Sequence, residues 1–130
     1  MDWLNDNAIL LTQKTLDVSW AKQKVALDNI ANVDTPRYKA KFVLFEEELR
    51  RKLSRFEGKD HVNVSDLRKE ITSSNLQIRQ NGEESNRLDG NNVNLDVEEL
   101  EVVRNTYQYQ FALRQISDQF ARLRLAIEGR

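Results

Sequence analysis

The sequence contains no cysteine, one proline and four glycines among its 130 residues. Without thiols the chain cannot form disulfides or thiolate metal sites, and it has no cysteine nucleophile. It has no run of about 18 consecutive apolar residues, so we expect no transmembrane helix and no direct insertion into a membrane. The amino end lacks the basic region and the apolar core of a Sec-type signal peptide, so we expect no cleaved signal.

An excess of charge of either sign is also missing. The 20 basic and 21 acidic residues give a net charge of -1. Because a chain without surplus positive charge is poorly suited to neutralise phosphates, we expect no nucleic-acid partner. Hydrophobic residues make up 39% and charged residues 32% of the chain, which predicts one small domain with a thin core.

Patterns for catalysis or cofactor binding are absent from the sequence. It contains no nucleophile elbow, no phosphate-binding glycine loop and no HExxH motif. His61 is the only histidine and stands in a polar stretch typical of a surface. An EF-hand loop with Gly90 at its sixth position would place Arg87 and Ser85 at ligand positions, so a turn before a helix cap explains that segment better. We expect no cofactor, no metal and no enzymatic activity.

A long helix is predicted over about residues 95–127 by apolar positions that alternate spacings of four and three. The seam comprises Val102, Thr106, Tyr109, Leu113, Ile116, Phe120, Leu123 and Ile127. Asn92 and Asn94 are candidate N-caps, and Asp96 with Glu99 resembles a capping box. Such a helix would be roughly 50 Å long, more than a lone small domain requires, so the heptads favour assembly. An ordinary helical-hairpin core is the alternative.

A second long helix is predicted over about residues 4–31, where no proline or glycine interrupts two apolar rows. One row comprises Leu4, Ala8, Leu11, Val18 and Val25, and the other Ile9, Leu16, Trp20, Leu27 and Ile30. Because one partner helix covers only one flank, we expect the other flank to face further subunits or to stay exposed. The aromatic residues Trp3, Trp20, Tyr107 and Tyr109 are candidates for interface anchors or for packing between the two helices.

The middle of the chain, residues 33–94, has a weaker pattern. A short amphipathic helix is predicted from Glu46 to Glu57, with Gly58 as its C-cap. Period-two alternation at Val62 and Val64, and again at Leu76 and Ile78, indicates at most a small hairpin or a loop. The predicted fold is therefore all-α dominated: long helices at 1–32 and 95–130 pack as an antiparallel coiled-coil hairpin and form one helical domain. The middle segment adds a short helix and an irregular or β-hairpin part.

The end of the first helix is marked by local chemistry. Pro36 disfavours helical dihedrals at Thr35, and Asn32 tolerates a left-handed C-cap, so the helix must end near Asn32. Side chains of Asp34 and Thr35 can bond nearby backbone amides and order the corner that follows. Asn29 and Asn32 either stop the helix or form hydrogen bonds between subunits.

The corner carries a motif, Asn29-Ile30-Ala31-Asn32, followed by Asp34-Thr35-Pro36 and Tyr38-Lys39. It resembles the signature of the flagellar rod and hook proteins. The segment from Leu88 to Leu95, and a length near 130 residues, are similar to the proximal-rod members of that family. One position departs from the pattern, because Arg37 stands where the family usually has glycine. Glycine would allow a type II turn through positive φ, so Arg37 predicts a type I or open turn.

The resemblance implies a structural subunit of the proximal rod of the bacterial flagellar basal body, in the periplasmic space. Its terminal helices would assemble into a helical tube that transmits motor torque, encloses the export channel and is required for motility. The implied partners are copies of the chain, other rod proteins, the basal-body base and the type III export apparatus. Phe42 and Phe45 are candidates for export recognition, with core packing as the alternative. A coiled-coil adaptor or export chaperone is the competing class, but it would not need the corner motif.

Overall fold

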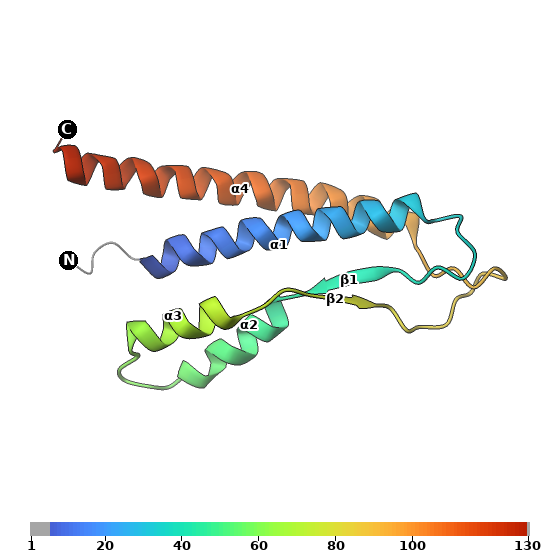
Figure 1. The fold of residues 1–130 in the computed structure, drawn as a ribbon, viewed down its shortest axis with the longest axis horizontal. Coiled ribbons are helices and arrows are strands. Elements are labelled where there is room, and N and C mark those ends of the chain that lie inside the picture. The colour runs from blue at the N-terminus through green and yellow to red at the C-terminus, as the bar shows by residue number, and fades with distance from the viewer. Residues whose placement is uncertain (1–5, 130) are drawn as a thin grey trace.

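The two predicted long helices are present and lie side by side in the computed structural model, which describes residues 6–129 (Figure 1). Helix α1 spans Asp6–Ala31 and helix α4 spans Leu95–Glu128. The start of α1 and the end of α4 lie at the same end of the molecule, so the pair is antiparallel, as predicted. Trp3 and Leu4 lie outside the described residues. Asn94 is the N-cap of α4, because its side chain accepts a hydrogen bond from the Val97 amide at 3.3 Å. The predicted Asn92 cap and Asp96/Glu99 capping box are therefore wrong.

Only half of the predicted seam of α4 packs against α1. Val102, Tyr109, Ile116 and Leu123 are half-buried, while Leu113, Phe120 and Ile127 are exposed. The buried positions between them are Asn105 and Ala112. Thr106, half-buried, donates its hydroxyl to Gln23 of α1 at 3.3 Å. Small and polar residues fill the rest of the contact between α4 and α1. Hydropathy therefore predicted a seam centred on the more apolar positions, which lie to one side of the observed contact.

The hydrophobic core lies on the other side of α1 and joins it to a short sheet. Val18 and Val25 of α1 pack with Val43 and Phe45, and the partly buried residues Ala21, Leu49 and Leu76 surround them. Strand β1, Lys41–Leu44, pairs antiparallel with β2, Gln77–Gln80, and Val43 lies opposite Ile78. The sheet of the same chain thus covers the flank of α1 that α4 leaves free. The expectation that this whole flank faces other subunits or stays exposed is wrong. Trp20, 65% exposed, and Leu27 stay accessible.

Two short helices lie beyond one end of the two-stranded sheet (Figure 1). Helix α2 spans Glu46–Leu53 and is followed by the 3-10 turn η1, Ser54–Phe56. The predicted helix to Glu57 therefore ends early, and Gly58, with a φ of 76°, follows the turn.

Helix α3, Val64–Ser73, replaces the loop or hairpin predicted around Val64. Asn63 caps it by accepting from the Ser65 amide at 2.9 Å, and Ile71 is buried. Lys14 of α1 donates to the carbonyl of Ser74 at 3.1 Å and holds the carboxyl end of α3. The alternation at Leu76 and Ile78 does mark strand β2, but its partner is β1, more than thirty residues upstream.

Candidate functional site: the junction between the long helices

Asn29 ties the last turn of α1 to the first residue of β1. Its side chain is fully buried, and its Nδ2 donates to the Lys41 carbonyl at 2.8 Å. Its Oδ1 accepts from the Lys41 amide at 2.9 Å and from the Tyr38 hydroxyl at 3.3 Å. The amide therefore pairs with the Lys41 backbone as a neighbouring strand would. These bonds give Asn29 a role within the subunit, whereas a bond to another subunit would need an accessible amide.

Asn32 ends α1 through hydrogen bonds and not through a left-handed backbone. Its Nδ2 donates to the carbonyl of Asp28 at 2.8 Å, and its Oδ1 accepts from the Thr35 hydroxyl at 3.1 Å. Among residues 6–129, Arg37 is the non-glycine residue with positive φ, so the left-handed cap predicted for Asn32 is wrong. Thr35 bonds a side chain and not the predicted backbone amide. Asp34 and Pro36 lie exposed on the corner.

Arg37 adopts the conformation that a glycine would take. Its φ is 61°, and the Tyr38 amide donates to the Thr35 carbonyl at 3.3 Å across the turn. This positive φ is the one that a type II turn requires, so the predicted type I or open turn is wrong. The reason lies in tertiary contact, because the Arg37 amide donates to the Asp89 carbonyl at 2.9 Å. That bond from a distant segment overrides the local preference of arginine.

Asn91 joins the corner to the segment that enters α4. It is fully buried, and its Nδ2 donates to the carbonyls of Asn32 and Thr35, both at 2.9 Å. Its Oδ1 accepts from the Val93 amide at 2.8 Å. One side chain thus satisfies backbone groups of two segments that are far apart in the sequence. Sequence reasoning did not select Asn91 as a site residue, although the density of asparagine in residues 91–94 was a usable signal.

Asn92 makes the matching link to the sheet. Its Oδ1 accepts from the Ala40 amide at 2.7 Å, and its Nδ2 donates to the carbonyls of Asn81 at 3.1 Å and Glu83 at 3.3 Å. Lys39 also donates to the Glu83 carbonyl, at 3.2 Å. Asn92, considered only as a cap of α4, instead connects the two strands at the point where they diverge.

An ionic group covers the same helix end. The Asp28 carboxylate accepts from the Tyr38 hydroxyl at 3.2 Å and pairs with the Lys41 ammonium at 3.0 Å. The hydrogen bond from Lys41 lowers the pKa of Asp28. Burial, followed by the charge of Asp28, raises the pKa of Tyr38, and the Asp28 hydrogen bond raises the pKa of Lys41. The Lys41 ammonium also lies 5.6 Å from the centre of the Tyr38 ring.

We call this set of bonded segments, residues 28–41 with 81–94, the junction. The buried asparagines Asn29 and Asn91 bond to backbone on both sides, which holds the direction in which the chain leaves α1 and enters α4. Across residues 6–129, no group of three or more acidic or histidine side chains is placed to hold a metal ion. Over the same residues, no helix is long and apolar enough to cross a membrane. The arrangement suits mechanical coupling.

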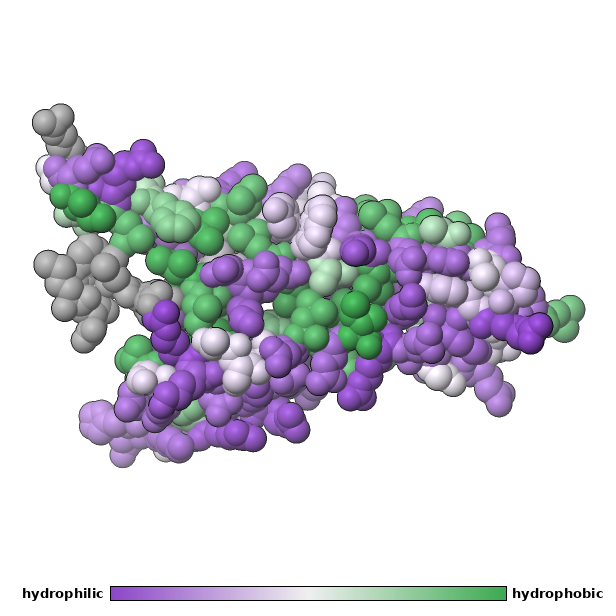
Figure 2. All heavy atoms as spheres, viewed as in Figure 1, coloured by the Kyte–Doolittle hydropathy of each residue, from purple (hydrophilic) through white to green (hydrophobic). Residues whose placement is uncertain are grey.

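Large apolar side chains are exposed along both long helices. Figure 2 shows green side chains gathered over α1 and α4, whereas the short helices are mostly purple. On α4 the exposed residues are Leu95, Val97, Leu100, Val103, Tyr107, Phe111, Leu113, Phe120, Leu125 and Ile127. Of the residues predicted to pack along α1, Val18 and Val25 are buried and Leu16 is half-buried, while Leu11, Trp20 and Leu27 are exposed.

The two phenylalanines considered for export recognition lie in different surroundings. Phe45 is 4% exposed and belongs to the core, and Phe42 is 41% exposed on β1. Within the motif, Ile30 is half-buried and Ala31 is exposed at the end of α1.

Comparison with known proteins finds close relatives of one kind. No family model matches the chain. The chain is 39% identical over 112 residues to the flagellar basal body rod protein FlgB of Bacillus subtilis (strain 168), and the alignment covers 83% of each chain. It is 32% identical over 120 residues to FlgB of Aquifex aeolicus (strain VF5), covering 92% of each. It is 31% identical over 123 residues to FlgB of Escherichia coli (strain K12), covering 88% of each.

Proposed function

The chain belongs to the FlgB family of flagellar basal body rod proteins, and we propose that it is a structural, non-enzymatic subunit of the proximal rod. In this proposal the subunit lies in the periplasmic space and assembles through α1 and α4 into a helical tube. The tube transmits motor torque, encloses the export channel and is required for motility. The subunit reaches the rod through the type III export apparatus without a cleaved signal.

The observation that supports assembly is the apolar surface of α4 that α1 does not cover. Leu100, Val103, Tyr107 and Phe111 recur at spacings of three and four, which places them on one face of the helix. With about 100° between successive residues, Tyr107 projects nearly opposite the buried Asn105. Tyr107 is 69% exposed. A continuous apolar face of this kind on a soluble surface marks a protein contact.

Leu113, Phe120 and Ile127, at intervals of seven residues, form a second exposed row beside the contact with α1. We assign this half of the seam to contacts with neighbouring subunits, together with Trp20 and Leu27 of α1. The partners are copies of the chain, other rod proteins and the basal-body base. Contacts between two different surfaces of like subunits extend as an open helical array when the rotation between subunits does not close a ring.

The junction supports the transmission of torque. Because Asn29, Asn91 and Asn92 bond backbone groups from separate segments, the corner cannot rotate without breaking several buried hydrogen bonds. We propose that residues 1–32 and 95–130 form the assembly domain and that residues 33–94 brace it. In this proposal, the fixed direction of the corner keeps α1 and α4 aligned under load.

Assembly is tested by complementing a Bacillus subtilis strain that lacks its own FlgB with this chain and its variants. Replacing Val103 and Phe111 together by Lys leaves the exposed face soluble, so the subunit should fold normally and fail to enter isolated basal bodies. The control is Gln108→Lys, an exposed polar position on the same helix. Normal swimming by the double variant would contradict the assignment of this face, and exclusion of the unmodified chain from the rod would contradict the function.

Export recognition by Phe42 is tested separately. A Phe42→Ala chain should fold as the parent does, because this ring is largely outside the core, yet its secretion should fall if the ring is recognised. Phe45→Ala is unsuitable as a test, since it opens a cavity in the core. Unchanged secretion of Phe42→Ala removes Phe42 from the recognition segment.

A further inference from the structure

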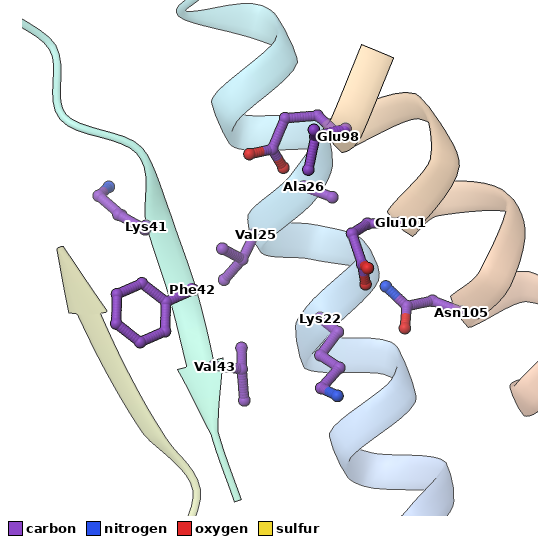
Figure 3. A pocket seen from close by; sticks show the side chains of 10 residues that line it. Lys22, Val25, Ala26, Lys41, Phe42, Val43, Glu98, Glu101 and Asn105 are labelled. Atoms are coloured by element: carbon purple, nitrogen blue, oxygen red, sulfur yellow. The ribbon is translucent and has the colours of Figure 1, made fainter. Parts of the chain in front are cut away.

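A pocket of about 220 Å³ opens between α1, β1 and the first turns of α4 (Figure 3). Val25 and Val43 provide apolar wall, and Glu98, Glu101 and Asn105 enter from α4. The pocket adjoins the junction through Lys41 and through Asn29, which hydrogen-bonds to Glu98, whereas Asn105 of its lining takes no part in the junction.

Asn105 lies in this pocket as a buried amide without partners. Its side chain is 1% exposed, and neither its Nδ2 nor its Oδ1 has a hydrogen-bond partner among residues 6–129. In Figure 3 the amide lies on the side of the pocket where Glu101 and Lys22 also point inward. A buried amide that bonds to nothing costs free energy, so it calls for a group that supplies hydrogen bonds.

The charges around the pocket leave one carboxylate uncompensated. Lys22 pairs with Glu46, Lys41 pairs with Asp28 at 3.0 Å, and Glu101 pairs with Arg104 at 3.0 Å. Glu98 has no cationic partner among residues 6–129; burial raises its pKa, although a hydrogen bond with the Asn29 side chain acts in the opposite direction. Both lysines at the pocket are therefore already engaged with carboxylates outside it.

These groups match a guanidinium better than an ammonium. A guanidinium carries five N–H donors in one plane and can donate to the Glu98 carboxylate or to the Asn105 oxygen. The methylene stem of the same side chain can pack on Val25 and Val43.

The chain carries suitable arginines at the far end of α4. Arg122 and Arg124 are exposed and have no ion pair among residues 6–129. These arginines lie near the end of the molecule that holds the start of α1 and the end of α4, and α4 projects there beyond the short helices (Figure 1). Arg122 is 17 residues from Asn105, about 26 Å along the helix axis, so it cannot enter the pocket of its own chain.

We propose that the pocket receives Arg122 or Arg124 from a second copy of the chain, as a head-to-tail contact between subunits. This rests on the proposed function, since it names one contact of the assembly. The contact joins two different surfaces, the pocket of one copy and the carboxyl end of α4 of the next. It therefore propagates an array and leaves each end of the array free to add a subunit.

The natural absence of cysteine allows a direct crosslinking test. A purified copy with Val97→Cys, a residue that lines the pocket and is exposed, is mixed under mild oxidation with a differently tagged copy carrying Ala121→Cys beside the arginines. The expected product is a disulfide-linked heterodimer. Adding Glu98→Arg to the first copy should lower its yield at least about tenfold, because a like charge then faces the arginine. Adding Glu99→Arg, an adjacent exposed position with the same charge change, should leave the yield unchanged.

Restored yield is the decisive result. Glu98→Arg in the first copy should crosslink again when the second copy carries Arg122→Glu and Arg124→Glu. Absence of the heterodimer from the parent pair, equal yields for Glu98→Arg and Glu99→Arg, or failure of the charge exchange to restore the yield would each overturn the proposal. Circular dichroism of each copy verifies folding. Rod incorporation tests the function separately: if the unmodified chain and Glu98→Arg enter the rod equally, only the pocket contact is refuted.

Discussion

Arg37 is the position at which a single substitution should make the subunit more stable. Its backbone has a φ of 61°, in the left-handed region that disfavours residues with a Cβ atom. A left-handed conformation costs a non-glycine residue about 1–2 kcal/mol. Arg37→Gly removes this strain while the Arg37 amide keeps its bond to the Asp89 carbonyl.

The gain is reduced by the greater freedom of glycine in the unfolded chain, which is worth about 0.4–1 kcal/mol. The Arg37 side chain is exposed, so its loss removes little packing. We therefore expect the free energy of unfolding to rise by about 0.5–1 kcal/mol, or Tm by about 2–5 °C. Urea titration and thermal unfolding, both followed by circular dichroism at 222 nm, measure the two quantities.

Arg37→Ala is the matched control. It removes the same side chain but keeps the Cβ atom, so it should show none of the stabilisation. If Arg37→Gly is no more stable than Arg37→Ala, the positive φ stores no strain and the reasoning about the corner is wrong.

Three further results are expected. Asn29→Ala leaves the amide and carbonyl of Lys41 without their buried partner, so urea titration should show a loss of about 2–4 kcal/mol, and a loss below 1 kcal/mol would contradict the pairing. The pKa of Asp28 is lowered in the folded state, so its contribution to stability is present above the ordinary value of 3.8 and is lost as the pH falls below that value. Asp28→Asn should therefore flatten the acid limb of a plot of stability against pH between about pH 2 and 5, and an unchanged limb would refute this. Asn105→Leu replaces an unpaired buried amide, so it should raise the free energy of unfolding by about 1–3 kcal/mol. The same variant should reduce the heterodimer yield in the crosslinking test. A lower free energy of unfolding would instead show that bound water satisfies the amide.

The long helices, the end of the first one and the family could all be predicted from the order of the residues. Uninterrupted periodicity over residues 6–31 and 95–128 is a local property, and each helix supplies its own backbone hydrogen bonds. Pro36 acts on its immediate neighbour, so the end of α1 could be located without knowing what packs there. The motif around Asn29 likewise pointed to the family, although not to what its side chain bonds.

The bonds that hold the corner and the helix faces that remain exposed depend on how distant segments pack together. The turn at Arg37 depends on a carbonyl of Asp89, and Asn91 bonds to residues 56 and 59 positions upstream. Such contacts depend on the path of the whole chain and leave no periodic trace in the sequence. For the same reason hydropathy could not show that Asn105 and Ala112, and not Leu113 and Phe120, face α1: burial is set by which surfaces meet, and small or polar side chains can occupy the closest approach of two helices.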